Sequence, residues 1–557
     1  MKTIGITYYT DGIYEGMVHT LTDSIDTKST YTYNFEEKST VINDSTTDNT
    51  SIRCVKETYN DNLAVIKVED LKNSSENQQI QEIEYEEQEN VDPDNPSSNT
   101  DEYGNITKYE YDEDGNLTKT IYPDGSTEIS VYDQNNNLIH FTDRNGLVTE
   151  NTYNADGLLT KTTCGGIITA SYEYYPEKTY GIAGLIRSEY DGHSNRITYT
   201  YDNKGNILES TEYGISGNLV QTHTTKNTYD SQGRVIKTID PNGIITEYIY
   251  NEAGSVLLTK VQDKNGKNIQ ITRTVHDVLG RVIQEINALD YDSTKDNLEA
   301  DYYTDKNVGS RTKYDDKGQV ISETDRLGNT TSYIYDSDGN VSQETQPNGS
   351  YKTNLYDRDG RKIKEVFYDN ITKKTILSQV ISYTEGKNEV ITKDYMSDIM
   401  VATTKEEYDW EGNVIQKTEP NGAVSTNTYT NGLLTREEHA LGTWTEYVYD
   451  TWGRVTKQTS SFDADGDSIT KYTYDNYGNV LTESVKNSTA RQPESYSKKE
   501  YAYDLQDNLV KTVYYEGNTP VRCTQSFYSW DGKLLREFKG MKKPLIINGL
   551  NYIENPD

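Results

Sequence analysis

The feature that most constrains the fold of this chain is a short motif that returns at a fixed spacing. Each copy starts with tyrosine, usually followed by aspartate, and has a glycine four positions after the tyrosine and an aliphatic residue two positions later. The steps from Tyr111 to Tyr132 and from Tyr132 to Tyr153 are both 21 residues, and Tyr314 and Tyr335 are separated by the same step. A constant period of roughly 20–50 residues indicates a repeat architecture, in which each unit packs on its neighbours.

The motif contains the residue types that a tight turn requires. An aspartate side chain accepts hydrogen bonds from nearby backbone N–H groups, and glycine adopts positive φ without steric penalty. A second turn signal has its glycine 14 residues after the tyrosine, as in Pro123–Gly125 and Pro241–Gly243. We assign a structural role in the repeats to Tyr111, Asp112, Gly115, Tyr132, Tyr229, Asp230, Gly233, Tyr335, Asp336, Gly339, Tyr356, Asp357, Gly360, Tyr408, Gly412, Tyr449, Gly453, Tyr474 and Gly478.

The segments between the turn signals have the composition of β-strands. They are short and rich in Thr, Tyr, Ile and Val, and the alternate placement of Tyr248 and Tyr250 predicts that both lie on one face of a strand. Tyr333 and Tyr335 show the same spacing. Each repeat is therefore predicted to be a β-hairpin, and neighbouring hairpins should pair because a lone hairpin is marginal in water.

The number of repeats predicts a very wide sheet. About twenty hairpins would give roughly forty strands at ~4.8 Å spacing, or nearly 200 Å if laid flat. The native twist of roughly 20° per strand pair makes such a sheet curl. We therefore expect an all-β fold, in which tandem hairpins of ~21 residues form a wide curled or spiralling β-sheet shell.

The Tyr-Asp-x-x-Gly motif with a following Pro-Asn-Gly resembles the Rhs/YD-repeat family, over roughly residues 101–540. This resemblance implies a hollow β-shell that often encloses a C-terminal toxin, and it extends to wall-associated members that bind carbohydrate. Bacterial members usually end their core with a DPxG-type signature followed by a variable effector. The final LREFKGMKKPLIINGLNYIENPD lacks this signature, so no toxin is implied within this chain.

Composition narrows the choice of partners. The chain carries 49 Tyr but only 6 Phe, 33% hydrophobic residues and a net charge of −35. Tyrosine can supply a core that a count of aliphatic residues would miss. The negative charge argues against nucleic acid and anionic membranes as partners, because both attract clustered Lys and Arg. No apolar run is long enough to span a bilayer, and the start of the chain does not resemble a signal peptide. We expect a secreted or cell-surface protein whose export route is unknown.

Four regions are expected along the chain. Residues 1–72 are an irregular β region with degenerate repeats, and residues 73–100 are an acidic polar linker or loop. The repeat shell follows at 101–540. The tail at 541–557 is expected to stop before the core-terminating signature of the family.

No catalytic residue or cofactor site emerges from the sequence. The Asp-x-x-Gly carboxylates recur in every repeat, so they serve turn geometry, whereas catalysis would call for one special pair. Cys54, Cys164 and Cys523 form no metal or disulfide pattern, and His276 occupies the tyrosine position of its repeat. A weak candidate for calcium is the alternating set Asp463, Asp465 and Asp467, although an extended hairpin loop is the favoured interpretation.

Three tryptophans suggest a carbohydrate-binding hypothesis. Trp410, Trp452 and Trp530 lie at or beside the first turn of a repeat, where they could stack on sugar rings or cover neighbouring hairpins. Our leading hypothesis is a structural, non-catalytic shell or scaffold that encloses or displays a toxin or partner, with a C-terminal effector or cargo outside this chain. The alternative is a wall-associated adhesin that binds carbohydrate through its aromatic hairpin tips.

Overall fold

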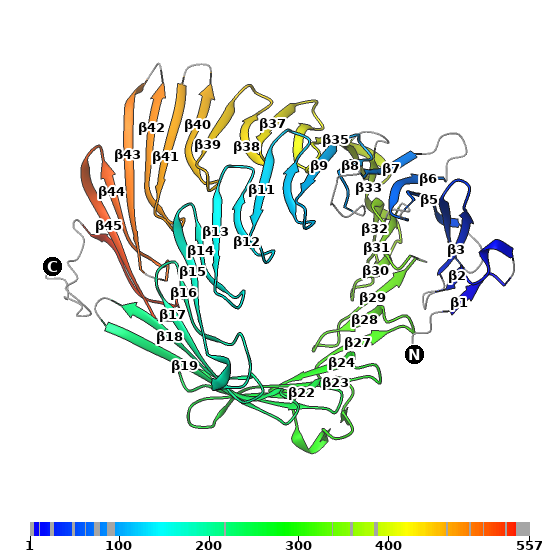
Figure 1. The fold of residues 1–557 in the computed structure, drawn as a ribbon, viewed down its shortest axis with the longest axis horizontal. Helices are drawn as coiled ribbons and strands as arrows, with labels where there is room; N and C mark the ends of the chain where they lie inside the picture. The colour runs from blue at the N-terminus through cyan, green and yellow to red at the C-terminus, as the bar shows by residue number, and fades with distance from the viewer. Residues whose placement is uncertain are drawn as a thin grey trace. The chain divides into compact units, whose positions relative to one another are not determined.

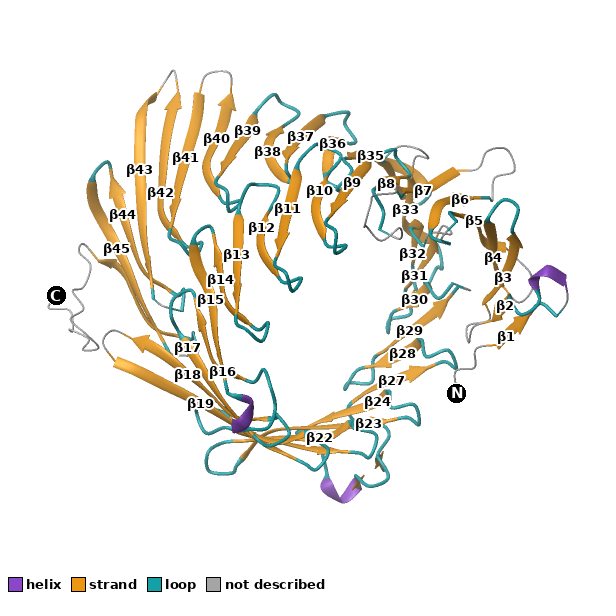
Figure 2. Ribbon diagram, in the orientation of Figure 1, coloured by secondary structure: helices purple, strands orange, loops and turns teal. Residues whose placement is uncertain are grey.

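The computed structural model describes residues 5–541 except 11, 23–26, 47–50, 62, 72–77, 86–94, 217–218, 337, 357–359, 384–387, 464–465, 490–491, 505 and 530–531. Within these residues there are 46 β-strands and three short 3-10 helices, η1 (Gly12–Tyr14), η2 (Glu177–Thr179) and η3 (Ser293–Lys295) (Figure 2). The predicted all-β fold class is confirmed.

Consecutive strands pair antiparallel along the chain, and the described strands form a long sheet of 44 members. The pair β25 and β26 forms a small separate sheet. Figure 1 shows successive strands side by side in sequence order, for example from β27 to β31 and from β37 to β43. Each hairpin therefore uses its edges to bind the hairpins before and after it, which satisfies backbone groups that a lone hairpin would leave to water.

The chain divides into two compact units, each assembled from separate stretches of sequence. Unit 1 comprises Met1–Ser126, Tyr248–Lys260 and Asn268–Ala423, and unit 2 comprises Thr127–Glu247, Val261–Lys267 and Val424–Asp557.

The strands that precede residue 127 are short and follow one another closely. They are β1 (Gly5–Tyr8), β2 (Val18–Thr22), β3 (Thr27–Asn34), β4 (Ser39–Thr46), β5 (Ser51–Tyr59), β6 (Val65–Asp70), β7 (Gln78–Glu84), β8 (Ser98–Asp101), β9 (Ile106–Tyr111) and β10 (Leu117–Ile121).

The next strands run to residue 250. They are β11 (Thr127–Tyr132), β12 (Leu138–Thr142), β13 (Val148–Tyr153), β14 (Leu159–Cys164), β15 (Ile167–Tyr174), β16 (Ile186–Asp191), β17 (Arg196–Tyr201), β18 (Ile207–Ser216), β19 (Leu219–Tyr229), β20 (Val235–Ile239) and β21 (Ile245–Tyr250).

The following group contains the short pair β25 and β26. Its members are β22 (Val256–Gln262), β23 (Asn268–His276), β24 (Val282–Asn287), β25 (Asp296–Asn297), β26 (Tyr302–Tyr303), β27 (Ser310–Tyr314), β28 (Val320–Thr324), β29 (Thr330–Tyr335), β30 (Val341–Thr345), β31 (Tyr351–Tyr356), β32 (Lys362–Tyr368), β33 (Thr375–Tyr383), β34 (Glu389–Met396), β35 (Ile399–Tyr408) and β36 (Val414–Thr418).

The last described strands all belong to unit 2. They are β37 (Val424–Thr430), β38 (Leu433–Glu438), β39 (Trp444–Tyr449), β40 (Val455–Asp463), β41 (Gly466–Tyr474), β42 (Val480–Thr489), β43 (Gln492–Tyr503), β44 (Leu509–Glu516), β45 (Thr519–Tyr528) and β46 (Leu534–Met541).

The two faces of a typical repeat strand differ. In β29, Tyr333 and Tyr335 are half-buried, whereas Ile334 between them is 55% exposed. The tyrosine face therefore supplies most of the side-chain packing, as its apolar ring and polar tip allow. A cluster of buried apolar residues lies at the insertion between β24 and β27, where Val275, Ile286 and Tyr303 pack together.

The segment expected as an acidic linker contains regular structure. Residues 78–84 form β7, which pairs with β6 and β8. The side chains of Ile83 and Tyr85 are half-buried, whereas those of Glu82 and Glu84 are exposed. This period-2 alternation favours a strand despite the acidic composition, because the carboxylates all point to the solvated face.

Candidate functional site

In the repeats that the structure describes, the motif builds the same type of turn. After β9, Oδ1 of Asp112 accepts hydrogen bonds from the backbone N–H groups of Asp114 (3.1 Å) and Asn116 (2.8 Å). The backbone N–H of Gly115 donates to the carbonyl of Asp112 (3.1 Å), and Gly115 has a φ of 83°. The side-chain amide of Asn116 also donates to Oδ2 of Asp112 (3.1 Å). The Asp, Gly and Asn of the motif thus each form hydrogen bonds within the turn.

Other residues adapt the same turn without changing its geometry. Gly339 has a φ of 88°, and Asn136 takes the glycine position of its repeat with a φ of 62°. Arginine replaces the final asparagine in some repeats, and Nε of Arg454 then donates to Oδ2 of Asp450 (2.8 Å). Asp357 lies outside the described residues, whereas Gly360 of the same turn has a φ of 77°.

The repeat tyrosine connects one hairpin to the preceding one. The hydroxyl of Tyr335 donates to the backbone carbonyl of Val320 (2.7 Å), the first residue of the strand after the preceding turn. Tyr356 repeats this bond with the carbonyl of Val341 (3.1 Å). We call these bonds tyrosine staples. The others include Tyr153–Leu138, Tyr174–Leu159, Tyr201–Ile186, Tyr229–Ile207, Tyr314–Val282, Tyr449–Leu434, Tyr474–Val455 and Tyr528–Leu509.

A second row of tyrosines lies two residues before the first and bonds to carboxylates on neighbouring strands. Tyr333 donates to Glu323 (2.9 Å) and Tyr447 donates to Glu437 (2.7 Å). Burial, followed by the hydrogen bond to glutamate, raises the pKa of Tyr333 and of Tyr447 to about 12. Both shifts arise because the phenolate would be desolvated and would face a carboxylate.

The insertion between β24 and β27 is held by a buried cation. Arg273 of β23 is fully buried, and its Nε and Nη1 atoms donate to Asp296 (2.8 Å) and Asp301 (2.9 Å). Oδ2 of Asp301 also lies 2.8 Å from Nδ1 of His276. His276 stands at the tyrosine position of its repeat and pairs with Val282, the first residue of the next strand. The sequence carries no sign of this network, because Asp296 and Asp301 lie 23 and 28 positions from Arg273.

Turns that are distant in sequence contact each other within unit 2. An added Cβ at Gly165 would lie 2.7 Å from the ring of Trp452, so glycine allows the tryptophan to pack on this turn. The side-chain amide of Asn431 donates to the carbonyl of Arg144, 287 positions away (2.8 Å). We call this set of contacts the turn seam.

A third contact of the turn seam surrounds His193. The ring of Tyr477 lies 3.5 Å from the ring of His193, and its hydroxyl donates to the carbonyl of Gly192 (2.5 Å). Nε2 of His193 lies 3.0 Å from Oδ1 of Asp507, which also accepts from the side chain of Asn479 (2.5 Å).

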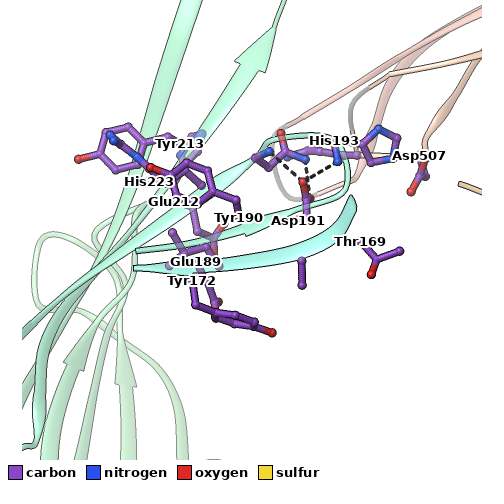
Figure 3. Close-up of a pocket in the computed structure, with 15 residues that line it drawn as sticks. Thr169, Tyr172, Glu189, Tyr190, Asp191, His193, Glu212, Tyr213, His223 and Asp507 are labelled. Atoms are coloured by element: carbon purple, nitrogen blue, oxygen red, sulfur yellow. Dashed lines mark hydrogen bonds and ion pairs between the residues drawn. The ribbon is translucent and has the colours of Figure 1, made fainter. Parts of the chain in front are cut away.

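A cavity of about 550 Å³ opens beside this contact (Figure 3). Its wall includes Glu189, Glu212 and His223 from three of the strands β16–β19, together with His193 and Asp507 from the two turns. Its carboxylates are partly occupied, since Glu189 accepts the hydroxyl of Tyr199 (2.6 Å) and Asp191 accepts the N–H groups of its own turn. The residues around this cavity hold two distant turns together. Among them, no nucleophile lies beside an activating base.

The proposed glycan-binding tryptophans make contacts of this kind. In unit 1 the ring of Trp410 stacks on Tyr122 at 5.6 Å, and Trp452 packs on Gly165 in unit 2. Both rings are half-buried, and Trp530 lies outside the described residues. The sequence predicted these positions on hairpin turns but could not identify their partners, which are far away along the chain.

The candidate calcium residues are described only in part. Asp465 lies outside the described residues, whereas Asp463 ends β40 and Asp467 is exposed in β41. Over the portion of the chain that is described, no group of three or more His, Cys, Asp or Glu side chains is arranged to hold a metal ion. No described helix has the length and apolarity to cross a bilayer.

Comparison with known proteins gives one family and one fold. The RHS repeat model matches residues 94–127, 229–268 and 314–351. No curated protein matches the sequence. The crystal structures of TcdB2-TccC3-Cdc42 and of TcdB2-TccC3 without its hypervariable C-terminal region each contain a chain similar to 97% of this one, with a TM-score of 0.57 and 14% identity.

These similarities cover only part of the solved chains and concern the fold. This chain spans 30% of the length of each of the two solved chains, and at 14% identity the similarity concerns the fold alone. The repeat family rests on the three matched segments and on the turns and staples described above. The resemblance predicted from the Tyr-Asp motifs is confirmed in these three segments, where the chain matches the RHS repeat model.

Proposed function

We propose that this chain is a structural scaffold of the Rhs type, which is not itself an enzyme and holds a partner polypeptide. The observation that supports this proposal most is the recurrence of the tyrosine staple, which ties many hairpins to their neighbours by the same bond. Its fold is also that of longer chains found in TcdB2-TccC3 structures.

The mechanism is mechanical. Antiparallel pairing joins the hairpins edge to edge, the staples join them again through side chains, and the turn seam joins segments that are far apart in sequence. Each level of contact removes a way for the wall to open. Such a wall can shield or present a polypeptide without reacting with it.

The partner that we propose is a C-terminal toxin or effector domain, or another cargo, outside this chain. We place the protein outside the cell or on its surface as part of the same proposal. A net charge of −35 favours solubility and disfavours nucleic acid as a partner.

Protease protection tests the proposal. The partner candidate is the polypeptide encoded directly after codon 557 or, if a stop codon follows, by the adjacent gene. We expect it to copurify with the full chain and to resist a protease concentration that digests it alone. A partner that neither copurifies nor survives longer than it does beside an unrelated β-sheet protein would contradict the scaffold function.

The alternative proposal is an adhesin that binds wall carbohydrate through Trp410, Trp452 and Trp530. Sugar stacking needs an open ring face, and the contacts of Trp410 with Tyr122 and of Trp452 with Gly165 occupy part of two such faces. Saturable binding to wall polysaccharide that is lost in Trp410→Ala and Trp452→Ala would favour the adhesin. Equal binding by the parent and both variants would exclude these rings as the sugar site.

A further inference from the structure

A cavity of about 500 Å³ lies in unit 1 between the insertion and the sheet. The insertion contributes Tyr302 and Lys306 to its wall, and β27 contributes Arg311, Lys313 and Tyr314. A cavity of this size is typical of sites for small molecules.

The cavity is rich in cations although the chain is strongly acidic. Lys306 lies over the ring of Tyr302, with Nζ 5.1 Å from its centroid. Arg311 is half-buried and its Nη1 donates to the backbone carbonyl of Lys306 (3.4 Å), while Lys313 is exposed. Within the described part of the chain, none of these three cations forms an ion pair with a carboxylate.

The acidic residues near the cavity already have other partners. His276 and Arg281, which also line it, are matched by Asp301 and Asp277 at 2.8 Å and 2.6 Å. Several carboxylates of the insertion are engaged in the same way, and their ion pairs are Arg326–Asp290, Arg273–Asp296, Arg273–Asp301 and Lys295–Asp305. The cavity therefore retains an excess of positive charge that the protein does not neutralise.

The rest of the wall is apolar or aromatic. Val275, Ile283 and Ile321 contribute aliphatic surface, and Tyr302 and Tyr314 contribute rings. A ligand that matches this wall has an apolar body and an anionic group, because the rings and aliphatic side chains receive the first and the cations receive the second.

We propose that this cavity binds a small organic anion, in which a phosphate or carboxylate group is attached to a planar or aliphatic body. Arg311 offers a planar fork of donors to the anionic group, and Lys306 of the insertion and Lys313 of β27 add point charges. Because Lys306 belongs to the insertion and Lys313 to β27, the bound anion links the insertion to the sheet. Its binding to the folded state should also raise the unfolding temperature.

Isothermal titration calorimetry on the full chain tests this proposal with phenyl phosphate and benzoate as probes. Benzyl alcohol and benzylamine serve as neutral and cationic analogues. We expect one saturable site for at least one of the two anions, and at least tenfold weaker binding of the analogues. The proposal is overturned if neither anion binds saturably, or if the neutral analogue binds as tightly.

Lysine variants test whether the anion binds in this cavity. Lys313→Gln and Lys306→Gln change exposed side chains and should each weaken anion binding by about tenfold, the typical effect of losing one charge-assisted hydrogen bond. Lys178→Gln, at an exposed lysine of η2 in unit 2, removes the same charge elsewhere and should leave the affinity unchanged. Equal affinity in all variants, or equal weakening by Lys178→Gln, would overturn the assignment and would leave the scaffold function untouched.

Discussion

The hydroxyl of Tyr335 lies 2.7 Å from the backbone carbonyl of Val320 and donates a hydrogen bond to it. The same bond joins Tyr449 to Leu434 (2.6 Å) and Tyr474 to Val455 (2.7 Å). Phenylalanine would fill the same space but could not make this bond. The staple therefore gives a physical reason for a chain that has 49 tyrosines and only 6 phenylalanines.

The glycine of the repeat turn should resist substitution by a β-branched residue. Gly339 has a φ of 88°, and a Cβ there would lie 3.1 Å from Nε2 of Gln319. We predict that Gly339→Val destabilises the protein by at least about 1 kcal/mol, measured by chemical denaturation. Gly339→Asn should be milder, because Asn136 adopts a φ of 62° at the equivalent position. Equal stability of the valine variant and the parent would contradict the turn assignment.

Substitutions at two adjacent glycines can distinguish the contribution of the turn seam to stability from the cost of positive φ. Gly165 and Gly166 have φ values of 58° and 79°, but only Gly165 faces Trp452, whereas nothing lies within 4 Å of a Cβ at Gly166. We predict that Gly165→Ala destabilises unit 2 more than Gly166→Ala, because the alanine methyl must displace the tryptophan ring. Thermal unfolding monitored by tryptophan fluorescence measures both. A seam that does not exist in solution would give the two variants the same unfolding temperature.

Breaking the buried ion pairs of Arg273 should have a large effect. Asp296 has a side-chain exposure of 3%, and removal of its partner would leave an uncompensated buried charge. We predict that Arg273→Leu lowers the free energy of unfolding by roughly 3–5 kcal/mol.

The matched control is Arg187→Leu, which breaks an exposed ion pair with Glu173 and should change stability little. Adding Asp296→Asn to Arg273→Leu should restore part of the loss, because it removes one of the orphaned charges. A double variant that is as unstable as the sum of its parts would argue against a direct coupling.

The alkaline limit of stability should be set by tyrosine. The pKa of Tyr333 and of Tyr447 is raised to about 12, first by burial and then by a hydrogen bond to glutamate. In the unfolded chain these tyrosines ionise near pH 10. They therefore contribute their full stability to the folded state below about pH 10, and that stability is lost as the pH rises towards 12. Absorbance near 295 nm should show fewer tyrosinates at pH 11 in the native protein than in urea. Superimposable titration curves would contradict this.

Local structure could be predicted from the sequence because the repeat encodes it locally. The Asp-x-x-Gly turn at Asp112–Gly115 and the shared face of Tyr333 and Tyr335 follow from residue types and from the two-residue period of a strand. These interactions join residues within one repeat, so each copy of the motif carries the complete information.

Contacts between distant segments could not be predicted in the same way. The approach of Asn431 to Arg144 depends on the summed twist of many strands, and no single motif contains it. Arg273 occupies an ordinary strand position, and only the folded insertion shows that Asp296 and Asp301 converge on it. The ratio of tyrosine to phenylalanine was the one sequence signal that pointed to a role for the hydroxyl group.

The central claim of a stapled wall is tested most directly by Tyr335→Phe, compared with Tyr351→Phe in the neighbouring hairpin. The ring of Tyr351 stacks on Tyr368 at 4.6 Å, and within the described residues its hydroxyl makes no hydrogen bond. Native-state hydrogen exchange should show that Tyr335→Phe lowers the opening free energy of β28–β30 by about 1 kcal/mol, whereas Tyr351→Phe leaves it unchanged. Equal exchange in Tyr335→Phe and the parent protein would contradict the account.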